Sequence, residues 1–179
     1  MIKWLKHYLQ PKEQYPSIFD ITYKRLLQHG MKNICFDVDN TIIERFKITP
    51  EWKVKQLLQE LADLGFNLLL ISNNSDKRRL IRICEFLEVS VIVKSFKPLP
   101  WIYKKIEKDF NFQPKETIFI GDQLFTDVFG ANLFGFYSIY VDQMGNEDNL
   151  RRKILISIEK TIINYLNKLK KDPAVLVPE

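Results

Sequence analysis

The chain has 179 residues, with 27 Lys and Arg against 22 Asp and Glu, and carries a net charge of +5. Its 46% hydrophobic and 27% charged residues are typical of one globular domain and exclude a disordered or fibrous chain. The two cysteines, Cys35 and Cys84, form no CxxC pair, so we expect neither a disulfide framework nor a zinc site.

Five short apolar runs, rich in β-branched and aromatic residues, are predicted as β-strands. They span residues 33–38, 67–72, 90–93, 117–120 and 137–141. Helical spacing between them predicts helices over residues 50–65, 75–87, 99–110 and 124–134. The first helix has Thr49 as its N-cap, Pro50 at its first position and its end at Gly65. This alternation predicts an α/β fold, a doubly wound, Rossmann-like parallel sheet of about five strands.

The chain divides into three parts around this sheet. Residues 1–30 are an N-terminal appendage, residues 31–142 the domain that contains the sheet, and residues 143–179 a basic amphipathic helix and tail. No apolar run reaches the ~18 residues of a membrane-spanning helix, and the N-terminus has no signal-peptide pattern. We therefore expect a cytoplasmic protein that could lie peripherally on the inner face of the membrane.

Two carboxylates follow the first predicted strand. Asp37 and Asp39 stand at positions i and i+2, and they therefore project to the same side of an extended chain. Carboxylates held this close raise each other's pKa unless a cation lies between them, which favours a metal ion or a shared proton. The alternative interpretation is an Asx-type turn that caps the strand.

Acidic residues also follow the fourth predicted strand. Gly121 permits a tight turn, Asp122 stands at the tip of the strand, and Asp127 lies near the first turn of the next helix. Ligands bind beyond the carboxyl ends of the strands in such sheets, so we expect all these acids to converge at one edge. An oxygen-rich cluster of this kind suits Mg²⁺, a hard cation that also binds substrate phosphate.

Two further strand ends supply groups that suit phosphate. Ser72 and Asn73 follow the second strand, beside a predicted helix N-terminus that favours anions. Lys97 follows the third strand, directly before a proline, and could hold its ammonium over the same edge. Alone, this lysine would be interpreted as solvated surface. In combination with the acids, it predicts a clamp for a phosphoryl group.

In this order, the segments resemble the four motifs of the haloacid dehalogenase (HAD) superfamily of phosphatases. They are Asp37-Val38-Asp39-Asn40-Thr41, Ser72-Asn73, Lys97-Pro98 and Gly121-Asp122 with Asp127. The resemblance covers roughly residues 33–142. Flanking residues look like the YqeG-type branch of subclass IIIA, which is related to phosphatidylglycerophosphate phosphatases of mitochondria and plastids.

The resemblance implies a catalytic role for three residues. Asp37 would be the nucleophile that attacks phosphorus and forms an aspartyl-phosphate. Asp39 would protonate the leaving alkoxide and then activate the hydrolytic water. Lys97 would offset the charge of the phosphoryl group. An acid at the position of Asp39 implies phosphohydrolase chemistry, since dehalogenases and P-type ATPases of the superfamily lack it.

The same resemblance implies the binding residues. Substrate would be bound by Thr41, Ser72, Asn73 and Lys97. Mg²⁺ would be held by the side chains of Asp37 and Asp122 and by the backbone carbonyl of Asp39. Asp127 would play a supporting part and orient either Lys97 or a metal-bound water.

The spacing of the motifs leaves no room for a cap domain. Thr41 and Ser72 are separated by 31 positions, which a short loop and one helix use up, and Asn73 and Lys97 by 24, enough for one helix and one strand. An uncapped site is open to phosphate on a large body, and the resemblance makes phosphatidylglycerophosphate the first candidate. Two alternatives remain: a soluble phosphatase for a sugar phosphate, nucleotide or nucleic-acid end, and a binding protein for RNA, the ribosome or a membrane.

The C-terminal helix carries the basic charge of the chain. Residues 151–171 hold seven Lys and Arg and one acid. One predicted face is apolar: Ile154, Leu155, Ile158, Ile162, Tyr165, Leu166 and Leu169. The other face is basic, with Arg152, Lys153, Lys160 and Lys170, while Ile156 and Ile163 fall among polar positions. Such a helix packs on the domain or meets an anionic membrane surface, and nucleic acid is the less favoured partner.

Overall fold

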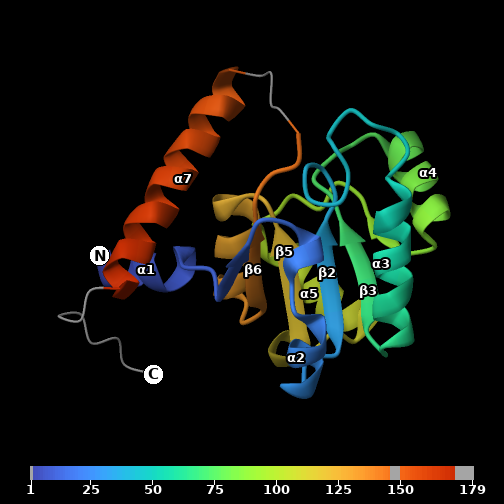
Figure 1. Ribbon diagram of the computed structural model, residues 1–179, viewed down its shortest axis with the longest axis horizontal. Helices are drawn as coiled ribbons and strands as arrows, with labels where there is room; N and C mark the ends of the chain where they lie inside the picture. Colours follow the sequence, from blue (N-terminus) through green and yellow to red (C-terminus); the bar gives the residue numbers. More distant parts are fainter. Residues whose placement is uncertain (1, 146–149, 172–179) are drawn as a thin grey trace.

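The computed structural model describes residues 2–145 and 150–171 and contains a six-stranded, all-parallel sheet in the order β1-β6-β5-β2-β3-β4 (Figure 1). The strands are β1 (Glu13–Tyr15), β2 (Asn33–Asp37), β3 (Asn67–Ile71), β4 (Val91–Ile92), β5 (Thr117–Gly121) and β6 (Tyr137–Val141). The helices are α1 (Ile2–Leu9), α2 (Tyr23–Gln28), α3 (Trp52–Asp63), α4 (Lys77–Leu87), α5 (Pro100–Phe110), α6 (Phe129–Leu133) and α7 (Leu150–Lys171). Short helical turns span Ile18–Asp20, Pro114–Glu116 and Leu124–Val128.

Helices cover both faces of the sheet, which confirms the doubly wound α/β architecture. Along β2, Ile34 and Phe36 join the core formed with α2, α3 and α4, whereas Cys35 joins the core formed with α5 and α6. Successive side chains of a strand point to opposite faces, so a central strand covered on both sides is apolar at nearly every position. No cap interrupts the fold, because only a loop and α3 lie between β2 and β3.

The sheet has one strand more than the five predicted. β1 comes from the N-terminal segment and pairs in parallel with β6, with Gln14 opposite Tyr140. Its sequence, Glu-Gln-Tyr, has no apolar run that would predict a strand. β1 is a short strand at the edge of the sheet, where polar side chains are tolerated. There Glu13 forms an ion pair with Arg25 at 2.5 Å and accepts a hydrogen bond from the Tyr137 hydroxyl at 2.6 Å.

Several helix boundaries differ from the predicted ones. Thr49 is not the N-cap of α3. The N-cap is Glu51, whose backbone is extended, and the helix begins at Trp52. Asp76 caps α4 by accepting a hydrogen bond from the Arg79 backbone. The helix predicted over residues 124–134 is divided into a wide π-type turn, Leu124–Val128, and α6. β4 has two residues and not four.

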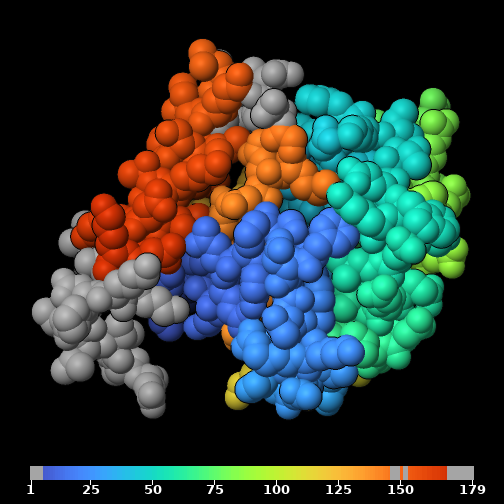
Figure 2. Space-filling view, in the orientation of Figure 1, coloured from blue at the N-terminus to red at the C-terminus, as the bar shows by residue number. Residues whose placement is uncertain are grey.

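The C-terminal helix packs through only part of the predicted apolar face, together with one residue from outside that face. α7 lies next to the N-terminal segment (Figure 2). Its residues Ile163 and Leu166 are buried in a cluster with side chains of α1, β6 and the turn Leu124–Val128. Ile163, expected among polar positions, is therefore a packing residue. The first turns of α7 rise away from the sheet (Figure 1). Four of the seven residues of the predicted apolar face are exposed: Ile154, Leu155, Ile158 and Tyr165. The side chains of Arg152, Leu169 and Lys170 lie outside the described residues.

Among residues 2–145 and 150–171, no helix is both long enough and apolar enough to cross a membrane.

A close approach between α6 and α5 generates a test of the packing. A methyl group at Gly130 would overlap the hydroxyl of Tyr103, whose ring stacks on Phe134 with 4.6 Å between centroids. Because overpacking a core strains the side chains around it, Gly130→Ala should lower the free energy of unfolding by about 1–3 kcal/mol in a urea titration. Adding Tyr103→Phe should restore part of the loss. An unchanged midpoint in the single variant would contradict this packing.

Candidate active site

The site lies where the central strands end. β2 is flanked by β5 and β3, with Asp37 opposite Ile71 and Phe36 opposite Ile120. This register brings Asp37, the segment after β3 and the segment after β5 to one edge of the sheet (Figure 1). The structure therefore places Asp37, Ser72 and Asp122 together, as the sequence predicts, and all three are buried.

Lys97 lies at the centre of the site, with its side chain only 1% exposed. Its Nζ is 2.5 Å from Oδ1 of Asp37 and 2.7 Å from Oδ1 of Asp127, and it also donates to the Ile71 carbonyl at 3.3 Å. Burial disfavours the ammonium form of Lys97, but the two carboxylates outweigh it and hold the pKa of this lysine above its ordinary value. The lysine is thus a buried cation shared by two acids.

The nucleophile candidate has a strongly shifted pKa. Burial raises the pKa of Asp37, Lys97 lowers it, and the neighbouring charges of Asp127 and Asp39 raise it again, so that it reaches about 7. Without a further cation, Asp37 would therefore be only partly ionised at neutral pH. A group with this surrounding is typical of a functional site.

Three buried carboxylates could hold a metal ion. Asp37, Asp122 and Asp127 each offer an oxygen, and these oxygens lie within 4.8 Å of one another. Against their three negative charges, Lys97 supplies one positive charge, so a divalent cation would balance the cluster. Carboxylate oxygens are the ligands that Mg²⁺ prefers. The hydroxyl of Thr41 lies between two of them, 3.2 Å from Oδ2 of Asp37 and 3.4 Å from Oδ1 of Asp122.

Asp127 contacts Lys97, which is one of the two supporting roles that the resemblance implies. Its Oδ1 pairs with Lys97 and its Oδ2 accepts from the backbone of Gln123 at 3.1 Å. The wide turn Leu124–Val128 carries this carboxylate back toward the sheet edge. Gly121 allows the approach, since a methyl group there would overlap the carboxyl group of Asp127. A glycine is thus required by close packing.

Asp39 is held by a residue that the sequence analysis missed. Arg79, a buried residue of α4, places Nη1 2.7 Å from Oδ1 of Asp39, while Asn74 donates to Oδ2 at 3.2 Å. The same guanidinium donates to the carbonyls of Lys47 at 2.8 Å and Glu44 at 3.3 Å. Arg79 therefore fixes both Asp39 and the loop after β2. The available signal was its place in the first turn of a helix that starts at this edge.

Asn73 holds the loop that carries Lys97. Its Oδ1 accepts from the Lys97 backbone at 2.7 Å and from the Ser95 hydroxyl at 2.6 Å, and its Nδ2 donates to the Lys97 carbonyl at 3.1 Å. The side chain is engaged by this loop, which indicates a positioning role. Ser72 lies next to Asp39, with Oγ 3.5 Å from Oδ2 of that residue. Substrate binding by both residues stays a prediction.

The chain is similar to known hydrolases and phosphatases. A family model described as haloacid dehalogenase-like hydrolase matches residues 44–135, just over half of the chain. The chain is 28% identical over 164 residues to "Probable phosphatase YqeG" of Bacillus subtilis (strain 168), with 92% of this chain and 95% of that protein covered.

Two other curated relatives carry substrate names. Glyceraldehyde 3-phosphate phosphatase of Pyrococcus abyssi is 30% identical over 139 residues, which cover 70% of this chain and 57% of that protein. Phosphatidylglycerophosphate phosphatase 1 of Arabidopsis thaliana is 20% identical over 151 residues, which cover 80% of this chain and 43% of that protein.

The shared lysine generates a stability prediction. Lys97→Met would leave Asp37 and Asp127 buried without their cation, and losing one partner of a buried ion pair costs about 3–5 kcal/mol. We expect a loss of this size by urea unfolding in Mg²⁺-free buffer at pH 8. The loss should be smaller at pH 6, because Asp37, with its raised pKa, is protonated there and no longer leaves an unpaired negative charge. As the pH rises, Asp37 ionises and the stability falls again.

The exposed Lys94, three residues before Lys97, provides the matched control. Lys94→Met should unfold at the wild-type midpoint at both pH values. Equal midpoints for the two variants would show that the buried ion pairs of Lys97 do not stabilise the fold.

Proposed function

Because the chain belongs to the haloacid dehalogenase-like hydrolase family and is a phosphatase, we propose that it hydrolyses phosphomonoesters through an aspartyl-phosphate on Asp37. One observation carries the proposal: Asp37 ends the central strand, buried, with a lysine ammonium 2.5 Å away and two further carboxylates within metal-binding reach. A carboxylate is a weak nucleophile toward an anion, so it needs this kind of positive surrounding.

In the first half of the reaction, a carboxylate oxygen of Asp37 attacks phosphorus and the bond to the leaving oxygen breaks. Asp39 donates its proton to that oxygen, so the product leaves as a neutral alcohol. Lys97 stays beside the phosphoryl group and stabilises its charge in the transition state. Ser72 and Thr41 are proposed to bind the phosphoryl oxygens, with Asn73 keeping the Lys97 loop in place.

In the second half, Asp39 is a carboxylate and accepts a proton from water, whose oxygen attacks the phosphorus of the aspartyl-phosphate. This step releases inorganic phosphate, regenerates the Asp37 carboxylate and returns the proton to Asp39. Arg79, 2.7 Å from Asp39, keeps the carboxylate aimed at the site in both halves. Mg²⁺ held by the side chains of Asp37 and Asp122 and the carbonyl of Asp39 would neutralise phosphate charge and favour the ionised form of Asp37.

We propose phosphatidylglycerophosphate as the substrate to test first. The absence of a cap between β2 and β3, and between β3 and β4, supports a phosphate on a large body. The similarity to the Arabidopsis enzyme supports this lipid in particular. The Pyrococcus relative, named for a small soluble phosphate, supports the alternative of a soluble ester.

The exposed face of α7 supports a peripheral contact with an anionic membrane. Leu150 is 71% exposed and Ile154 54%, and the exposed Lys153 and Lys160 lie on the same helix. Apolar burial and attraction between lysines and anionic lipids act together at such a surface. The contact would place the open site near a lipid headgroup.

The nucleophile is tested with Asp37→Asn. The amide cannot attack phosphorus as a carboxylate does, so phosphate release from p-nitrophenyl phosphate should fall by at least about 1,000-fold with the fold intact by circular dichroism. Asp63→Asn, at the exposed end of α3, is the control and should keep wild-type activity. Removing divalent cations with EDTA should abolish the activity of both wild type and control. Full Mg²⁺-dependent activity in Asp37→Asn would exclude this residue as nucleophile.

The substrate is tested with phosphatidylglycerophosphate in anionic vesicles against glyceraldehyde 3-phosphate in solution. We expect a higher kcat/KM for the lipid, and expect Leu155→Glu with Ile158→Glu to reduce vesicle binding in a flotation assay. Ser157→Glu with Thr161→Glu, two exposed positions on the same helix, is the charge-matched control. A higher kcat/KM for glyceraldehyde 3-phosphate, unchanged by the addition of vesicles, would contradict the assignment of a lipid substrate.

A further inference from the structure

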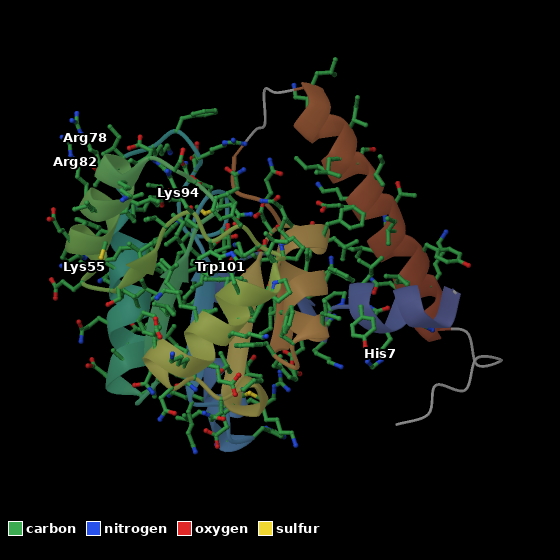
Figure 3. The ribbon with its side chains drawn as sticks, turned by 180° about the vertical axis from the view of Figure 1, so that it is seen from behind. His7, Lys55, Arg78, Arg82, Lys94 and Trp101 are labelled. Atoms are coloured by element: carbon green, nitrogen blue, oxygen red, sulfur yellow. The ribbon has the colours of Figure 1, made fainter. Side chains whose placement is uncertain are left out.

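A groove of about 540 Å³ lies beside the site, between the loop after β2 and the start of α4. Phe46 and Ile48 of the loop line one side, and both are exposed, Phe46 by 78%. Arg78 and Arg82, one turn apart on α4, line the other side, and Figure 3 shows them together, directed away from the sheet. Figure 2 shows the loop at the edge of the molecule next to α4. The groove thus combines apolar and basic walls.

The groove carries an excess of positive charge. Among the described residues, neither Arg78 nor Arg82 has an ion pair, and both are exposed. Arg45 also lines the groove, with its guanidinium 5.8 Å from the centre of the Phe46 ring. Arg79 also lines the groove, but its charge is balanced by Asp39. Asp76 is the acid in this lining, so Arg78 and Arg82 together exceed it by one positive charge, and this surplus complements an anion.

The groove lies next to Asp39, the residue that faces the leaving group in the proposed reaction. Two of its lining residues, Arg79 and Asn74, are hydrogen-bonded to Asp39 at 2.7 and 3.2 Å. In the proposed reaction Asp39 gives its proton to the leaving oxygen, so the alcohol part of the substrate lies on the Asp39 side of the phosphorus. The alcohol part therefore extends toward Arg78 and Arg82.

We propose that this groove is the subsite for the leaving group, and that it selects phosphomonoesters whose alcohol part carries a second anionic group and an apolar portion. Arg78 and Arg82 would bind the second anion through charge-assisted hydrogen bonds, and the apolar portion would pack on Phe46 and Ile48. A phosphodiester in a lipid headgroup and the second phosphate of a soluble bisphosphate share the anionic feature. The proposal rests on the proposed function, because it uses Asp39 as the acid.

Four esters separate the two features. Dihexanoyl phosphatidylglycerophosphate has a second anion and an apolar part, fructose 1,6-bisphosphate only the anion, p-nitrophenyl phosphate only the apolar part, and glycerol 3-phosphate neither. Arg78→Gln with Arg82→Gln should lower kcat/KM at least tenfold for the first two and change it less than twofold for the others. Phe46→Ala should lower it for the two apolar esters, and wild type should prefer the lipid.

The control removes the same charge elsewhere. Lys104→Gln with Lys108→Gln, also one turn apart and exposed, lies on α5 across the sheet and should change no ester by more than twofold. Affinities of the four esters are also measured calorimetrically in the Asp37→Asn background, where turnover is blocked. The arginine variant should lose affinity there only for the two anionic alcohols.

The outcomes distinguish this subsite from the phosphatase activity itself. If the arginine variant loses equally on all four esters, or on none, in both turnover and binding, the subsite is overturned although the phosphatase assignment stands. If wild type hydrolyses none of the four esters, the proposed function fails. Calorimetric binding in the Asp37→Asn background then still tests whether the groove binds an anionic alcohol part. Equal affinity of the Asp37→Asn protein for all four esters would overturn the proposal that the groove is a subsite for the leaving group.

Discussion

The site is organised by the ammonium group of Lys97, buried between the carboxylates of Asp37 and Asp127. A buried charge is costly unless it is paired, so the segments that carry these groups must be held accurately. The side chain of Asn73 is hydrogen-bonded to both the backbone N–H and the carbonyl of Lys97. The absence of a side chain at Gly121 lets the carboxyl group of Asp127 approach the strand. The structure around the site therefore holds one charge arrangement, in which Asp37 and Asp127 share one lysine and Asp122 lies beside them.

Much of this arrangement could be predicted from the sequence, for a physical reason. A buried parallel strand is recognisable as an apolar run, and its carboxyl end lies at the same edge as those of its neighbours. Polar residues directly after such runs, as at Asp37, Ser72 and Asp122, are therefore brought together by the sheet itself. The local sequence around each strand contains enough information to place these residues, although they are far apart in the chain.

The features that could not be predicted depend on contacts between distant elements. The sequence places Arg79 in the first turn of a helix that starts at this edge, but its ion pair with Asp39 is set by the way α4 packs on the sheet. β1 is a strand because β6 offers it an edge, not because Glu13 or its neighbours favour strands. The apolar residues of α7 occur on several sides, so their pattern does not reveal that Ile163 packs while Ile154 is exposed. In each case the partner surface decides, and periodicity within one element carries no information about it.

The central claim is that the buried acids exceed the lysine charge by two and that one divalent cation balances them. Titration calorimetry with Mg²⁺ tests it most directly. The account predicts one ion per chain for wild type and for Asp142→Asn, a change at an exposed acid, and no detectable binding for Asp122→Asn. Equal Mg²⁺ affinity in wild type and Asp122→Asn, or no binding by wild type at millimolar Mg²⁺, would contradict it.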